Sequence, residues 1–114
     1  MYELRLKFRF EAAHRLPGHP RCGKVHGHSY LVEVVLEGEQ LKDGMLVDFG
    51  EVKEKVRAIL PDHEYLNEVL PFIPTAENLA RYFFEKIGEI LDGPVKVKSV
   101  VVWETPNAGA CFSN

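Results

Sequence analysis

Residues 2–11 read YELRLKFRFE, and this stretch decides the fold. Apolar side chains occupy the even positions and charged side chains the odd ones, namely Tyr2, Leu4, Leu6, Phe8 and Phe10 against Glu3, Arg5, Lys7, Arg9 and Glu11. A period of two predicts a strand with one buried face. If the parity continues, His14 lies on the apolar side of this strand.

A second strand is predicted over residues 26–36. The same-face positions are His26, His28, Tyr30, Val32, Val34 and Leu36. His26 and His28 therefore point the same way, about 6.6 Å apart along the strand. If the two strands pair as an antiparallel hairpin, His14 falls opposite His26 or His28. Residues 15–25 then form an eleven-residue loop over this site, and loops of that length are often functional.

Two helices and two further strands follow. The first helix is expected to begin at a capping-box-like Asp48 and Glu51, and to end at Pro61. The second has Thr75 as its N-cap, and residues 92–94, Asp-Gly-Pro, end it. Strands are predicted over 95–104 and 109–113, separated by turn residues.

The predicted order ββααββ indicates an α+β fold in a single domain, residues 1–114. Its antiparallel sheet would carry both helices on one face. The charged face of the first strand gives the sheet a polar side, which could face water or line the pore of an oligomer.

Composition limits the classes of function. The chain is 46% hydrophobic and 27% charged, and its net charge of −3 argues against a nucleic-acid or membrane-surface partner, which requires a dense basic field. No apolar run approaches the roughly 18 residues of a membrane span, and the N-terminus does not read as a signal peptide. We therefore expect a cytoplasmic protein whose two cysteines are reduced thiols.

Four of the five histidines and one cysteine gather within fifteen positions, which predicts a metal site. Zinc binds imidazole readily. Three protein ligands with an open fourth position are typical of catalytic zinc, and four ligands of structural zinc. The well-placed ligands are His14, His26 and His28. Cys22 could close a structural site or act as an acid or base beside it, whereas His19, between Gly18 and Pro20, is expected to be a solvated loop residue.

Further candidates are more isolated. In Asp62-His63, the carboxylate can orient the imidazole and raise its basicity, although such a dipeptide is more often a solvated turn. Glu104, at a strand end, could bind a guanidine-like heterocycle edge through two hydrogen bonds, or be a surface charge. Glu77 lies in a first helical turn, where the helix dipole favours a carboxylate in any case. Cys111 is expected to be a small core residue.

Six motifs in order resemble the 6-pyruvoyltetrahydropterin synthase / 6-carboxytetrahydropterin synthase family. They cover essentially the whole chain and lie at residues 10–14 (FEAAH), 22–28 (CGKVHGH), 47–50 (VDFG), 62–67 (DHEYLN), 74–78 (PTAEN) and 103–105 (WET). The resemblance implies the tunnelling fold, in which ββααββ subunits assemble into a barrel. It also implies a homo-oligomer, typically a hexamer of two trimers, with active sites between subunits.

The resemblance also implies roles for individual residues. The ligands of Zn²⁺ would be His14, His26 and His28. Cys22 would be the catalytic acid-base, and Asp62 and His63 would complete a proton relay with it. Glu104 would anchor the pterin ring, while Thr75 and Glu77 belong to a segment that helps to hold it. Positive charge for a triphosphate could come from the loop residues Arg15, Arg21 and Lys24.

The substrate that the resemblance implies is 7,8-dihydroneopterin triphosphate. In this family, a shorter gap between the cysteine and His-Gly-His is associated with 6-carboxy-5,6,7,8-tetrahydropterin, which forms on the queuosine route with release of acetaldehyde and triphosphate, and a longer gap with the pyruvoyl product. The gap in this chain is the three residues Gly23-Lys24-Val25, which favours the carboxy product. Two alternatives stay open: the pyruvoyl product of the biopterin route, and a non-catalytic module in which zinc and four ligands staple the hairpin.

Overall fold

The two alternating segments form the long hairpin that the sequence predicts. In the computed structural model, which describes residues 1–114, β1 (Tyr2–His14) pairs antiparallel with β2 (His26–Gly38). The register places His14 opposite His26 and Ala12 opposite His28. The even-numbered positions 6–14 of β1 and 30–38 of β2 are buried, so the parity argument is confirmed and carries His14 into the interior.

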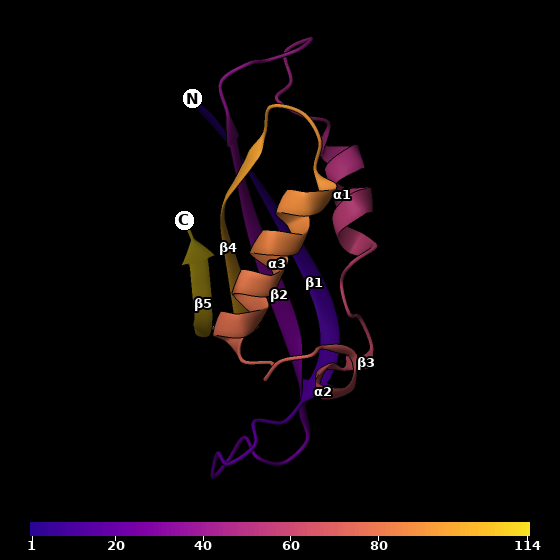
Figure 1. The fold of residues 1–114 in the computed structure, drawn as a ribbon, viewed down its shortest axis with the longest axis vertical. Coiled ribbons are helices and arrows are strands. Elements are labelled where there is room, and N and C mark those ends of the chain that lie inside the picture. Colours follow the sequence, from indigo (N-terminus) through magenta and orange to yellow (C-terminus); the bar gives the residue numbers. More distant parts are fainter.

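Five strands make one sheet, in the order β3-β1-β2-β4-β5 (Figure 1). The strands β4 (Lys96–Thr105) and β5 (Ala108–Ser113) extend the hairpin in antiparallel pairing. The fifth strand, β3 (Glu64–Tyr65), runs parallel to β1 beside Ala12 and Ala13. The prediction of a wholly antiparallel sheet is wrong at this one strand, because a two-residue strand has no periodicity from which to predict it.

Two main helices cover one face of the sheet (Figure 1). Helix α1 (Phe49–Arg57) begins where Asp48 accepts a hydrogen bond from the Glu51 backbone N–H, at 3.2 Å. Helix α3 (Ala76–Ile90) begins where the Thr75 hydroxyl accepts from the Asn78 N–H, at 3.1 Å. Both N-caps satisfy orphan donors, as the sequence predicts. A single helical turn, α2 (Leu66–Val69), was not predicted and follows β3 directly.

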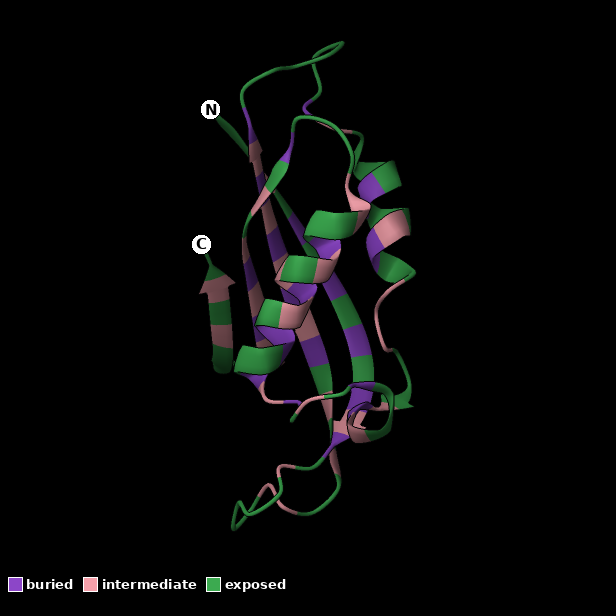
Figure 2. Ribbon diagram, viewed as in Figure 1, coloured by how far each residue is buried: buried purple, intermediate pink, exposed green.

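The core lies between the sheet and these helices, and Figure 2 shows buried residues alternating along the strands. It includes Phe10, Tyr30 and Phe83, with ring centroids of Phe10 4.7 Å from Tyr30 and 5.8 Å from Phe83. The outer edges of the sheet stay open: no strand pairs with the far side of β5 or with residues 2–10 of β1. None of the helices combines the length and apolar composition that crossing a membrane requires.

The molecule is elongated, 51 × 24 × 22 Å, and the loop of residues 15–25 extends past the end of the hairpin, at the bottom of Figure 1. The segment that contains β3 and α2 lies beside the root of this loop. The fold therefore gathers the residues around His14 and those around His63 at one end of the sheet.

Candidate metal and substrate site

Three histidine rings converge at the end of the hairpin. Ring nitrogens of His14, His26 and His28 all lie within 4.8 Å of one another, and the ring centroids are 4.6 to 5.0 Å apart. His14 is fully buried, and the other two are half-buried. The hairpin register produces this cluster, because it sets His14 opposite His26 while His28 follows two residues later on the same face. The cluster can hold a metal ion.

Hydrogen bonds to carbonyl groups fix the tautomers of two of these rings. His14 Nδ1 donates to the Pro74 carbonyl at 2.8 Å, and His26 Nδ1 donates to the Lys24 carbonyl at 2.7 Å. A carbonyl oxygen can only accept, so in the neutral rings the proton is on Nδ1 and Nε2 has a free lone pair. Carbonyl partners of this kind orient metal-binding histidines in proteins.

The two free lone pairs point at each other. His14 Nε2 and His26 Nε2 are 3.0 Å apart with no donor between them. Two zinc–nitrogen bonds of about 2.1 Å at a tetrahedral angle would separate the nitrogens by about 3.4 Å, so the observed spacing fits a metal after a small adjustment. The donor set and its geometry therefore fit a zinc-type ion.

Burial favours the neutral form of two of these rings. Desolvation lowers the pKa of His14 and of His28, while the charge of Glu104 acts in the opposite direction on both rings. Tyr30 is fully buried beside the cluster, with its hydroxyl 3.2 Å from His14 Nδ1, and burial raises its pKa. Neutral imidazoles are the form that binds a metal.

The thiol of Cys22 lies outside the histidine cluster. Cys22 is a free, half-buried cysteine in the loop of residues 15–25, and the group of metal-capable atoms contains the three histidines alone. The backbone of Cys22 is bonded at both ends, since its N–H donates to His19 Nδ1 at 2.9 Å and its carbonyl accepts from the Leu16 N–H at 2.6 Å.

The structure confirms one expectation for a lone residue and contradicts another. His19 is an exposed loop residue, as predicted, and its ring also accepts backbone hydrogen bonds from Arg21 and Cys22. The prediction of a core position for Cys111 is wrong. Cys111 is exposed, because it lies on edge strand β5 opposite Val101, on the sheet face away from the helices. Its neighbour Phe112 takes the inward position and packs on Phe84.

Asp62 and His63 are locked onto the backbone of β1. The Glu11 N–H donates to Asp62 Oδ1 at 2.9 Å, and the His63 N–H donates to the Glu11 carbonyl at 2.6 Å. The second carboxylate oxygen of Asp62 lies 3.0 Å from His63 Nδ1. The Glu11 N–H, followed by the His63 ring, lowers the pKa of Asp62. His63 has φ of 58°, a left-handed conformation that histidine adopts more readily than most residues.

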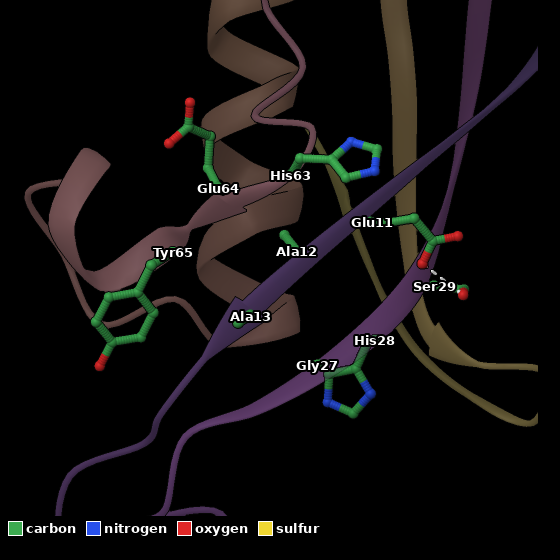
Figure 3. A pocket seen from close by; sticks show the side chains of 9 residues that line it. All are labelled: Glu11, Ala12, Ala13, Gly27, His28, Ser29, His63, Glu64 and Tyr65. Carbon is green, nitrogen blue, oxygen red and sulfur yellow. Dashed lines mark hydrogen bonds between the residues drawn. The ribbon is translucent and has the colours of Figure 1, made fainter.

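The His63 ring is the exposed end of this pair, with 78% of its side chain accessible. It lines a pocket of about 560 Å³ whose other walls come from β1, β2 and β3 (Figure 3). The wall includes His28 and the Glu11–Ser29 pair, in which the Ser29 hydroxyl donates to the Glu11 carboxylate at 2.6 Å. The Asp62-His63 dipeptide and the histidine cluster thus share one end of the sheet, while no hydrogen bond joins His63 to Cys22.

The three residues expected to hold a pterin line one pocket. Thr75, Glu77 and Glu104 surround a volume of about 330 Å³ between the start of α3, the end of β4 and β5. Glu104 is half-buried there, and its charge acts on both His14 and His28. The fold therefore brings the Glu104 carboxylate near the histidine cluster, although Glu104 and His14 are 90 positions apart in the sequence.

Three contributors to the site were not predicted. The Pro74 carbonyl and the Tyr30 hydroxyl both contact His14, and Asn67 binds the backbone of Arg15. Tyr30 could have been found, because it shares the face of His26 and His28 in the alternating pattern. Pro74 contacts His14 through its backbone carbonyl, and the amino-acid sequence gives no indication of such a backbone contact.

Comparison with known proteins places the chain in a family. The model of the family described as 6-pyruvoyl tetrahydropterin synthase matches residues 3–114. A Synechocystis 6-carboxy-5,6,7,8-tetrahydropterin synthase is 36% identical over 98% of this chain and 93% of its own. A Pyrococcus furiosus dihydroneopterin monophosphate aldolase is 38% identical over 83% of this chain and 82% of its own.

A solved structure agrees along the whole fold. The Caenorhabditis elegans 6-pyruvoyl tetrahydropterin synthase superimposes with a TM-score of 0.89 at 28% identity, covering 99% of this chain and 95% of that one. The arrangement of the sheet and helices is therefore shared. Together with the family match over residues 3–114, this makes the chain a member of the 6-pyruvoyl tetrahydropterin synthase family.

Proposed function

We propose that this protein is a zinc enzyme that converts 7,8-dihydroneopterin triphosphate and water to 6-carboxy-5,6,7,8-tetrahydropterin, acetaldehyde and triphosphate, as on the queuosine route. The observation that carries the proposal is the three-histidine cluster with two free Nε2 lone pairs, next to a pocket lined by Glu104. A site with three protein ligands keeps a coordination position for substrate.

Glu104 is suited to hold the pterin ring. A carboxylate can accept two parallel hydrogen bonds from the aminopyrimidine edge of a pterin, and such charge-assisted pairs are strong in a site that excludes water. Thr75 and Glu77 line the same pocket and would contact the ring beside Glu104. This arrangement orients the three-carbon side chain of the substrate toward the histidine cluster.

The chain's own proton-transfer groups would be Cys22, Asp62 and His63. A bound zinc ion would supply Lewis acidity, which makes hydroxyl groups of the substrate more acidic. The Cys22 thiol would move protons between carbon and oxygen of the side chain. The Asp62 carboxylate holds His63 by its Nδ1, so Nε2 of this exposed ring is free to exchange protons.

We further propose a hexamer of two trimers with active sites between subunits. The 78% exposed side chain of His63 and the two open sheet edges support an assembly in which neighbouring copies meet at this end of the fold. The charged face of β1 would line the channel of the barrel.

The product assay tests the proposal directly. Zinc-loaded protein is incubated with 7,8-dihydroneopterin triphosphate, and we expect acetaldehyde, triphosphate and the carboxylated pterin in equal amounts. Triphosphate without acetaldehyde would identify the pyruvoyl product. The similarity to the Pyrococcus furiosus aldolase suggests a second assay with dihydroneopterin monophosphate as substrate. If the protein cleaved the monophosphate and left the triphosphate unchanged, its activity would be that of an aldolase.

A further inference from the structure

The backbone around Cys22 is fully bonded although it lies in a surface loop. Cys22 and Gly23 have two N–H groups and two carbonyls, and all four make hydrogen bonds within residues 15–25. The donors and acceptors are His19 Nδ1, the Leu16 N–H, the His19 carbonyl and Arg15 Nε, at distances of 2.6 to 3.0 Å. Loop backbone of this kind is more commonly left to water.

His19 supplies two of these four bonds. Its ring Nδ1 accepts from the Cys22 N–H at 2.9 Å and from the Arg21 N–H at 3.1 Å, and its carbonyl accepts from the Gly23 N–H at 3.0 Å. The fit is close, because a Cβ at position 23 would lie 2.6 Å from the His19 carbonyl oxygen, so only glycine is accommodated there. Three backbone N–H groups of residues 21–23 therefore donate hydrogen bonds to His19.

The root of the loop is clamped as well. The Asn67 side chain accepts from the Arg15 N–H and donates to the Arg15 carbonyl, both at 2.9 Å, and the Arg15 side chain in turn reaches the Gly23 carbonyl at 3.0 Å. Asn67 thus fixes the point where β1 becomes loop. The remaining freedom at Cys22 is chiefly the rotation of its thiol about χ1.

We propose that His19 is a positioning residue that holds the Cys22 thiol at the catalytic site. This inference rests on the proposed function, in which Cys22 transfers protons. The ring does not touch the reacting atoms; it sets the Cys22 amide, and through it the place of the sulfur. Proton transfer is sensitive to such placement, and a displacement of about 1 Å can reduce a rate by a factor of about 10².

The test compares His19→Ala with His19→Asn in zinc-loaded protein. The asparagine Oδ1 occupies nearly the position of the histidine Nδ1 and can accept the same two backbone N–H groups. We expect His19→Ala to lower kcat about 10- to 100-fold with KM changed less than about threefold, and His19→Asn to recover most of kcat. Zinc content and melting temperature should stay close to those of the parent protein in both variants.

A second readout does not depend on turnover. In a Cys111→Ser background, which leaves Cys22 as the single thiol, the rate of alkylation by iodoacetamide is measured at pH 7. The His19→Ala substitution should raise this rate several-fold, because the half-buried thiol becomes accessible when the loop loosens. The His19→Asn substitution should return it toward the parent rate.

The outcomes separate the two proposals. An unchanged kcat and alkylation rate in His19→Ala would overturn the positioning role, as would a His19→Asn variant that is as impaired as His19→Ala. An inactive parent protein whose alkylation rates still change as expected would overturn the proposed reaction and leave the role of His19 in placing the thiol standing.

Discussion

His14 and His26 present their Nε2 lone pairs to each other at 3.0 Å, and each ring has its proton on the opposite nitrogen, bonded to a carbonyl. Two such lone pairs repel in the absence of a cation. The hairpin register and the carbonyls of Pro74 and Lys24 hold the two rings in this orientation, which suits a metal ion shared between them.

Replacing a metal ligand should release zinc. Each of His14→Ala, His26→Ala and His28→Ala removes one of three protein donors, and we expect most of the bound zinc to be lost in each, as measured by elemental analysis after dialysis. His19→Ala is the matched control from the same part of the chain and should retain zinc. Stoichiometric zinc in all three ligand variants would contradict the assignment.

Cys22→Ala separates a catalyst from a structural ligand. If the thiol transfers protons, the variant should keep its zinc and its oligomer while turnover falls by a factor on the order of 10² to 10⁴. His63→Ala should act in the same direction and more mildly. Loss of zinc together with a lower melting temperature in Cys22→Ala would instead support the non-catalytic module in which Cys22 is the fourth zinc ligand. It would contradict the proposed role of Cys22 in catalysis.

Glu104→Gln tests the anchor for the pterin. The glutamine side chain keeps the shape of the glutamate and one acceptor oxygen, but it has no charge. We therefore expect KM to rise roughly 10-fold or more, which corresponds to the loss of one charge-assisted hydrogen bond. Zinc content should not change, because Glu104 is not among the clustered ligands. Glu39→Gln, at an exposed position just after β2 and away from this end of the sheet, is a suitable control for the loss of one carboxylate. A KM equal to that of the parent protein would remove Glu104 from the binding site.

The Asp62 carboxylate should contribute to stability in a defined range of pH. The Glu11 N–H lowers its pKa below the ordinary value of 3.8, so the folded state prefers the charged form. Its stabilisation is fully present above pH 3.8 and is lost as the pH falls through the lower, folded-state pKa. In urea unfolding of both proteins, the stability difference between parent and Asp62→Asn should shrink below pH 3.8. A difference independent of pH would show that the charge of Asp62 has no role.

Assembly is open to a simple measurement. One subunit of 114 residues leaves β5 and most of β1 unpaired at the sheet edges, and unpaired edges are costly for an isolated protein. We expect sedimentation at micromolar concentration to give a hexamer. A monomer under these conditions would count heavily against sites shared between subunits.

The sequence predicts the parts of this molecule that depend on periodicity and caps. Alternation alone places His14, His26 and His28 on one buried face, and Asp48 and Thr75 begin the two main helices as expected. Alternation and capping are local signals, because they can be read from residues that are close together in the sequence. The cluster itself then follows from antiparallel pairing.

What the sequence does not predict depends on backbone geometry or on distant segments. Strand β3 exists because Asp62 and His63 bind the Glu11 backbone, a contact across 51 positions. The role of His19 follows from the path of a loop, which side-chain pattern does not encode. Cys111 could have been predicted correctly, because Phe112 is the larger apolar neighbour and competes for the inward position on β5.

The placement of all three histidines on one hairpin has a consequence for the order of folding. Closing the eleven-residue loop costs less chain entropy than bringing in residue 62 or residue 74, so β1 and β2 can meet before the later segments dock. The metal ligands would then be together in the folding nucleus, while the pterin pocket is still unformed. In stopped-flow experiments, zinc present at the start of refolding should accordingly increase the refolding rate. Zinc that bound only the completed fold would leave the refolding rate unchanged and lower only the unfolding rate.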